Sequence, residues 1–276
     1  MKLFSKLTVV AALGCSSALL AAAQTCSAPK LRKELRQLTV QEGYNLAAAF
    51  DRLKTLGWLD YFAQKWNGDL DSFDGKPEFL PYIRSFIRAL EIQLQSLDPS
   101  ITLPYFNWAQ DAARPAESTI FNSFMWGSDG NPDNNHCVDD WLFSWTMMTP
   151  TPHCVQRQFS TSVTPWPQSS VDAMLRQEKA YDGINSALQG ADRAVQLFMG
   201  GDMATRFRPN DPVLYFHLAM IDRIYTAWQN ADSKTRTTAY AQGGNLSAYV
   251  PGFANEKYKI RDVLNLKKAS MCYSYS

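Results

Sequence analysis

The stretch that decides the fold runs from Asn210 to Gln229 and reads NDPVLYFHLAMIDRIYTAWQ. Pro212 suits the first turn of a helix, where no amide donor is needed, and Asp211 directly before it can cap that turn. The apolar residues behind it fall largely at helical spacing: Leu214, Met220, Ile221, Ile224, Tyr225 and Trp228. The stretch therefore predicts a buried helix, and this helix carries one histidine, His217.

The first residues of this 276-residue sequence indicate a secreted chain. Residues 1–23 have the pattern of a signal peptide, with basic Lys2 and Lys6, an apolar middle and the small residues 21–23 as a cleavage site. We therefore expect one domain, residues 24–276, with no membrane span in the mature chain. Asn245, in the sequence Asn-Leu-Ser, is a possible glycosylation site. With 27 basic and 26 acidic residues and no basic cluster, we expect no nucleic-acid partner.

Four cysteines remain after the predicted signal peptide is removed. An even number in a secreted chain predicts two disulfides, and four cysteines allow three pairings. We favour Cys137–Cys154 within one loop region and Cys26–Cys272 between the two ends of the chain.

The histidines next to two of these cysteines leave an alternative open. His136-Cys137 and His153-Cys154 could supply the two cysteines and two histidines of a zinc site. We favour the disulfide because a secretory pathway oxidises such thiols.

Other segments also carry helical patterns. Thr39 and Glu42 have the spacing of a capping box, and the amphipathic segment behind them ends at Gly57. A second amphipathic segment begins near Pro77 and has the apolar face Phe86, Ile87, Leu90, Leu94 and Leu97. Residues 170–181 and 183–201 predict two more helices. Residues 58–75 are rich in aromatic and acidic side chains, and residues 109–168 predict long irregular connections.

The order of these motifs resembles the tyrosinase, catechol oxidase and haemocyanin family of type 3 copper proteins. The stretch 210–229 is similar to the family's second copper-binding helix. The segment Phe79-Leu80-Pro81-Tyr82-Ile83-Arg84 is similar to its first copper motif, Phe-Leu-Pro-Trp-His-Arg. Residues 103–108 resemble its Leu-Pro-Tyr-Trp-Asp-Trp segment, and Gly200-Gly201 resemble the end of its His-x-x-x-His-x-x-x-Gly-Gly helix.

The resemblance implies a mainly α fold with a tyrosinase-like four-helix-bundle core, long irregular loops and two disulfides. The family closes its catalytic domain with a Tyr-x-Tyr motif that meets an arginine from the N-terminal segment. Tyr273 and Tyr275, with Arg32, fit that role. The sequence stops one residue after Tyr275, so we expect no C-terminal shielding domain of the kind that some relatives carry.

The copper ligands are where the sequence departs from the family. The dicopper centre needs six histidines, three for each metal, because imidazole suits both oxidation states of copper. This chain has three histidines in all, His136, His153 and His217. By the family's spacing, the six ligand positions fall on Lys65, Asp74, Ile83, Asp192, Gln196 and Leu218. The first position lies in a loop that varies within the family, so the resemblance implies a variable loop around Lys65. We therefore expect that the copper ligands are replaced and that no copper cofactor is bound.

The favoured hypothesis is a copper-free pseudoenzyme outside the cell. Its role would be binding or structural, and its partner could be an extracellular small molecule, a polymer or a protein. The family oxidises phenols and catechols with dioxygen, so an oxidoreductase of the tyrosinase or polyphenol oxidase type with a remodelled metal site is one alternative.

A second alternative is a non-copper enzyme that uses Asp74 and Asp192. It requires both carboxylates to face one central pocket, together with Gln196 and His217. Two carboxylates in such a pocket would shift each other's pKa apart, which is how acid/base pairs arise. The competing interpretation is a salt-bridged former pocket, in which Asp192 pairs with a cation such as Arg193 or Lys65.

Overall fold

The computed structural model describes residues 26–141, 145–250 and 258–276, so the predicted signal peptide lies outside the described residues. The helices of this part of the chain are α1 (Val40–Thr55), α2 (Trp58–Phe73), α3 (Phe79–Leu97), α4 (Trp108–Asp111), α5 (Gln168–Gln177), α6 (Tyr181–Met199), α7 (Val213–Ala231), α8 (Ser233–Arg236) and α9 (Ile260–Val263). The strands are β1 (Lys30–Arg32), β2 (Thr146–Met147), β3 (His153–Cys154) and β4 (Tyr273–Tyr275). The predicted mainly α fold with two disulfides is confirmed.

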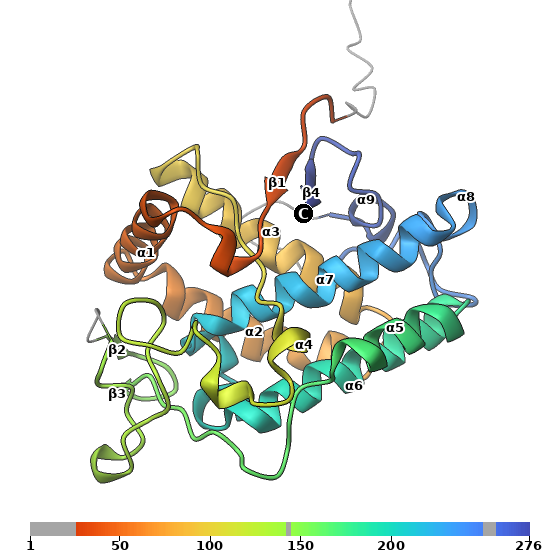
Figure 1. The fold of residues 1–276 in the computed structure, drawn as a ribbon. Helices are drawn as coiled ribbons and strands as arrows, with labels where there is room; N and C mark the ends of the chain where they lie inside the picture. The colour runs from red at the N-terminus through yellow and green to blue at the C-terminus, as the bar shows by residue number, and fades with distance from the viewer. Residues whose placement is uncertain (1–25, 142–144, 251–257) are drawn as a thin grey trace, which may run out of the picture.

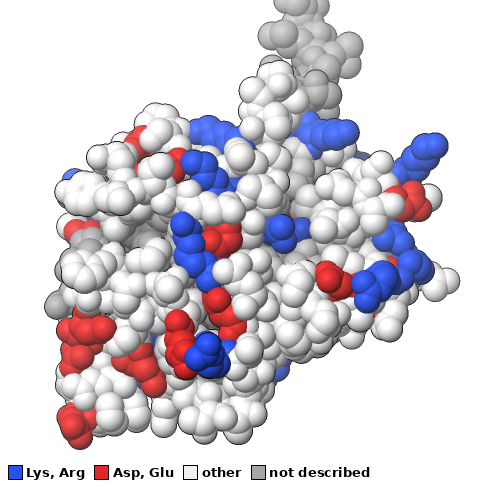
Figure 2. Space-filling view, in the orientation of Figure 1, with Lys and Arg blue, Asp and Glu red and all other residues white. Residues whose placement is uncertain are grey.

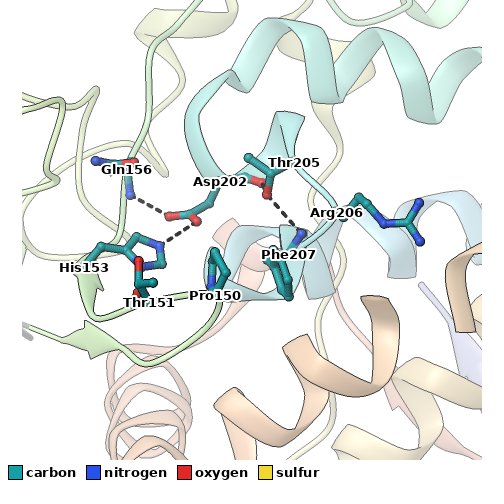
Figure 3. A pocket seen from close by; sticks show the side chains of 8 residues that line it. All are labelled: Pro150, Thr151, His153, Gln156, Asp202, Thr205, Arg206 and Phe207. Carbon is teal, nitrogen blue, oxygen red and sulfur yellow. Dashed lines mark hydrogen bonds and ion pairs between the residues drawn. The ribbon is translucent and has the colours of Figure 1, made fainter. Parts of the chain in front are cut away.

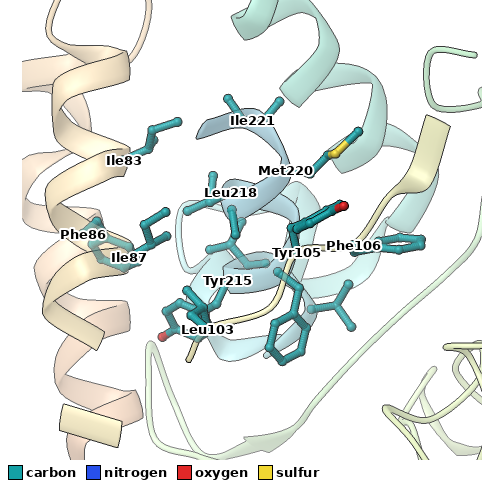
Figure 4. Packing of buried hydrophobic residues seen from close by; sticks show 14 of the residues in the cluster. Ile83, Phe86, Ile87, Leu103, Tyr105, Phe106, Tyr215, Leu218, Met220 and Ile221 are labelled. Atoms are coloured by element: carbon teal, nitrogen blue, oxygen red, sulfur yellow. The ribbon is translucent and has the colours of Figure 1, made fainter. Parts of the chain in front are cut away.

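The helix α7 lies at the centre of the molecule and packs against both α3 and α6 (Figure 1). Its first turn is capped as predicted, because the Asp211 Oδ1 atom accepts a hydrogen bond of 2.9 Å from the Val213 amide. Most residues of α7 are buried, and their apolar side chains meet the apolar face of α3 (Figure 4). Burial of this apolar surface is the main source of stability of the core.

The capping box at the start of α1 is formed in full. The Glu42 amide donates to Thr39 Oγ1 over 3.2 Å, and the Thr39 amide donates to Glu42 Oε2 over 2.8 Å. Gly57 follows the helix with a φ of +79°, a conformation that glycine adopts without strain. The chain therefore turns at the predicted position.

The prediction of a variable loop around Lys65 was wrong, because residues 58–73 form the helix α2. Its buried apolar residues, Leu59, Phe62, Ala63, Trp66, Leu70 and Phe73, recur every three or four positions. The period was therefore present in the sequence, but the many acidic residues of the exposed face obscured it.

Two short sheets lie at the disulfides. The strand β1 pairs in parallel with β4, which brings the two ends of the described chain together beside the Cys26–Cys272 bond. The strand β2 pairs antiparallel with β3 beside the Cys137–Cys154 bond. Both predicted pairings are confirmed, and the zinc alternative is wrong because Cys137 and Cys154 are bonded to each other.

The irregular connections between α4 and α5 lie over the helical core, as predicted (Figure 1). In the described part of the chain, the helices are too short or too polar to cross a bilayer. Figure 2 shows Lys and Arg side chains interspersed with Asp and Glu on the face that it draws, which fits the balanced charge of the sequence.

Candidate functional site

Three of the predicted site residues meet at the centre of the bundle. Asp192 and Gln196 are four residues apart on α6 and therefore share one face of the helix. The His217 Nε2 atom from α7 lies 2.8 Å from Asp192 Oδ1, and Gln196 Nε2 donates to Asp192 Oδ2 over 2.5 Å. All three side chains are buried. The structure therefore brings these three side chains into contact.

A fourth residue of the cluster, Arg208, was not predicted. Its Nη1 atom lies 3.9 Å from Asp192 Oδ2, and its guanidinium lies 5.9 Å from the centre of the Trp66 ring. Burial alone would raise the pKa of Asp192, but the hydrogen bond and charge of His217, with the charge of Arg208, lower this pKa below its ordinary value. The negative charge of the buried Asp192 carboxylate is therefore balanced by the neighbouring basic side chains of His217 and Arg208.

Asp192 forms ion pairs in the structure, but with His217 and Arg208 and not with the partners that were expected. The expected partners lie elsewhere, since Lys65 pairs with Asp69 on its own helix and Arg193 contacts Gln196 at 3.4 Å. The signal that could have identified Arg208 was a basic residue directly before the turn that starts the central helix.

Two of the positions matched to copper ligands carry hydrocarbon side chains. Ile83 on α3 and Leu218 on α7 are both 0% exposed and belong to the apolar core (Figure 4). Neither side chain has an atom that can bind a metal. Ile87 on α3 and Ile221 on α7 are also 0% exposed and belong to the same apolar cluster (Figure 4).

The expectation that Asp74 and Asp192 face one pocket was wrong. Asp74 follows the last residue of α2 and is exposed, whereas Asp192 is 3% exposed in the interior. Side chains at the end of a helix turn with the local backbone, and sequence spacing does not fix their direction. The structure therefore does not bring together the two carboxylates that a new acid/base site would need.

The donors present at the centre do not fit copper. The Nε2 atom of His217 already contacts a carboxylate, and its ring lies 6.2 Å from the ring of Trp108. Across residues 26–141, 145–250 and 258–276, no group of three His, Cys, Asp or Glu side chains is arranged to hold a metal ion. A cuprous or cupric ion prefers several imidazole or sulfur donors, and one imidazole beside a carboxylate and an amide is a poor match.

The fold places the protein in a defined structural class, that of the helical cores of tyrosinases and haemocyanins. A polyphenol oxidase from Thermothelomyces thermophila superposes with a TM-score of 0.73 at 17% identity, over 90% of this chain and 89% of that one. A functional unit of Octopus hemocyanin gives a TM-score of 0.65 at 15% identity, over 90% of this chain and 68% of that one.

The sequence comparisons identify the family. Residues 44–231 match the family described as the common central domain of tyrosinase, and the chain therefore belongs to the tyrosinase family, which is of the copper-binding type. Among curated relatives, a tyrosinase from Streptomyces antibioticus is 29% identical over 78% of this chain and 87% of its own length. The tyrosinase-like protein phomQ1 from Diaporthe leptostromiformis is 26% identical over 91% of this chain and 79% of its own length.

The buried cluster gives a testable stability effect. We expect Asp192→Ala to lower the free energy of unfolding by about 1.5–3 kcal/mol, because His217 then loses a buried charged hydrogen-bond partner and Arg208 loses the carboxylate 3.9 Å away. Urea unfolding at pH 7 measures this loss. The control is Asp172→Ala on α5, whose carboxylate only accepts from exposed Gln168, and which should change stability by less than about 0.5 kcal/mol. Equal losses for the two variants would contradict the assignment.

Proposed function

We propose that this chain is a secreted member of the tyrosinase family that does not assemble a dicopper centre and has a binding or structural role instead of oxidising phenols. The observation that carries this proposal is the nature of the side chains at the ligand positions. Ile83 and Leu218 are buried hydrocarbons, and the imidazole of His217 is engaged by Asp192. A dicopper site would need nitrogen donors at these places.

Secretion is supported by three separate features. The first 23 residues have the pattern of a signal peptide, and two disulfides require an oxidising compartment. Asn245, the predicted glycosylation site, is exposed and therefore accessible to modification.

The alternative of a remodelled copper oxidase has less support. It would need a second imidazole near His217, and the remaining two histidines lie elsewhere. His153 pairs with Asp202 on the surface side of the molecule, and His136 lies in the irregular connection before the Cys137–Cys154 bond. The acid/base enzyme that would combine Asp74 with Asp192 is not proposed, because these carboxylates lie apart.

Metal analysis tests the proposal directly. The mature protein would be secreted by cells grown with added copper, dialysed against copper-free buffer, and measured for copper content and catechol oxidation. We expect copper well below one ion per chain and no oxidation above that of buffer. Two copper ions per chain together with catechol oxidation would overturn the proposal.

A matched variant identifies where any copper binds. In His217→Gln the only histidine of the bundle centre is removed. Copper that is retained by this variant lies outside the bundle, which agrees with the proposal. Stoichiometric copper that is lost with His217 would overturn it.

A further inference from the structure

A cavity of about 470 Å³ lies outside the bundle centre (Figure 3). One wall comes from the loop that leads into β3, with Pro150, Thr151 and His153. The other wall follows the end of α6 and includes Asp202 and Phe207. The volume lies within the range of small-molecule sites, and none of its lining residues belongs to the cluster around Asp192.

The two walls are joined by an ion pair between His153 and Asp202. The His153 Nε2 atom lies 3.0 Å from Asp202 Oδ1, and His153 Nδ1 lies 2.6 Å from the carbonyl oxygen of Thr151. The other carboxylate oxygen accepts a hydrogen bond of 2.8 Å from the Gln156 amide. The Asn210 Nδ2 atom lies 3.4 Å from His153 Nε2, but it donates to Asp202 Oδ1 over the shorter distance of 3.2 Å. Because each ring nitrogen has an acceptor as its nearest partner, the arrangement favours an imidazolium with a proton on each nitrogen.

Titration of this pair follows from its surroundings. Burial lowers the pKa of His153, but the hydrogen bonds to Asp202 and Thr151 raise it by more. The pKa of His153 is therefore above its ordinary value. Burial raises the pKa of the Asp202 carboxyl, and its hydrogen bonds from Gln156 and His153 offset only part of that rise. Both groups therefore hold protons more tightly than they would in water.

The imidazole is the more accessible half of the pair. The carboxylate of Asp202 is 4% exposed, whereas the side chain of His153 is 19% exposed, so a ligand can contact the imidazolium more readily than its counter-ion. Asp60 on α2 also acts on His153, but its charge is balanced by Lys54 at 2.7 Å. At the rim, Arg206 adds a further positive charge, and it pairs with exposed Asp71.

The apolar part of the cavity lies between these basic groups. In Figure 3 the rings of Pro150 and Phe207 lie between His153 on one side and Arg206 on the other. An aromatic ring of a ligand gains from contact with Phe207, and an anionic group gains from the nearby positive charge. The cavity therefore combines a flat apolar contact with the accessible imidazolium of His153.

We propose that this cavity binds small aromatic carboxylates, with the ring against Phe207 and Pro150 and the carboxylate toward His153. The inference rests on the proposed function, because it names a ligand class for the binding role. Attraction comes from the charge of the imidazolium, since both of its N–H groups are already engaged. A small ligand of this kind should bind with a dissociation constant on the order of millimolar.

The test is an NMR titration of the mature chain with ring-labelled histidine, which gives three signals. The probes are phenylacetate and its neutral analogue phenylacetamide, at pH 6 and pH 8.5, in metal-free buffer. At pH 6 we expect phenylacetate to shift the His153 signal saturably and to bind at least tenfold more tightly than phenylacetamide. The signals of His136 and His217 should stay in place. Binding should weaken as pH rises through the pKa of His153, because the cation is lost.

Two variants separate the contributions of charge and contact. His153→Gln should remove the preference for phenylacetate over phenylacetamide, measured by calorimetry. Phe207→Ala should weaken the binding of both probes by roughly five- to tenfold. His136→Asn, outside the cavity, should change neither. Equal binding of both probes by the unmodified protein, or no saturable shift of His153, would overturn the ligand class. The copper measurement is independent of this result, so a failure of one does not imply a failure of the other.

Discussion

Replacing Asp222 with alanine is expected to lower the free energy of unfolding by about 3–5 kcal/mol, because it leaves the buried guanidinium of Arg84 without a counter-ion. Asp222 on α7 is 0% exposed. It accepts hydrogen bonds from Arg84 Nε at 2.6 Å, from the Tyr273 hydroxyl at 2.6 Å and from the Tyr275 hydroxyl at 2.7 Å. The Nη1 atom of Arg32 lies 3.7 Å away.

This network joins segments that are distant in the sequence. Arg32 lies on β1, Arg84 on α3, and the two tyrosines on β4. Arg32 also pairs with buried Glu91 at 2.8 Å and lies 3.5 Å from the centre of the Tyr273 ring. The role predicted for Arg32 with the Tyr-x-Tyr motif is therefore confirmed. Without Asp222, Arg84 loses its carboxylate partner, whereas Arg32 keeps its ion pair with Glu91.

Equilibrium unfolding in urea measures the effect, with an unchanged dependence on urea concentration as the check for two-state behaviour. The matched control is Glu117→Ala, which removes an ion pair of 3.0 Å with Arg114 at the surface. Because that pair is exposed, its loss should cost at most about 1 kcal/mol. If Asp222→Ala is no more damaging than this control, the buried network does not stabilise the fold.

Removing the disulfide between Cys26 and Cys272 should produce the other large effect. These cysteines are 246 residues apart, and by the chain-entropy account a loop of this length stabilises by about 5 kcal/mol. The double variant Cys26→Ser, Cys272→Ser avoids a free thiol that could exchange with the other bond. We expect a clear decrease in the urea midpoint relative to the unmodified protein.

The second disulfide serves as an internal comparison. Cys137 and Cys154 are 17 residues apart, so the corresponding double serine variant should lose about 3 kcal/mol. The prediction is that the variant without Cys26–Cys272 loses more stability than the variant without Cys137–Cys154. A smaller loss for the long loop would contradict the chain-entropy account of these two disulfides.

Much of the fold could be predicted because its signals are local. The capping box of Thr39 and Glu42, the start of the central helix at Asp211 and the apolar period of α3 each depend on a few neighbouring residues. The helix α2 was missed although its period is regular, because its acidic exposed face dominated the composition. The disulfide pairing was also predictable, since four cysteines leave few choices.

The candidate site was only partly predictable because it depends on directions in space. Asp192 and His217 come from helices whose facing sides the sequence indicates, and they do meet. The exposure of Asp74 depends on how the chain leaves α2, and the approach of Arg208 depends on the turn before α7. Neither is fixed by spacing along the chain.

The parallel pairing of β1 with β4 has a practical consequence for handling the protein. An affinity tag or tether attached beyond Tyr275 would extend from the surface next to β1. In Figure 1 this place is well separated from β3, next to which the cavity of His153 lies. Attachment to a sensor surface through that end should therefore leave the cavity accessible to dissolved molecules.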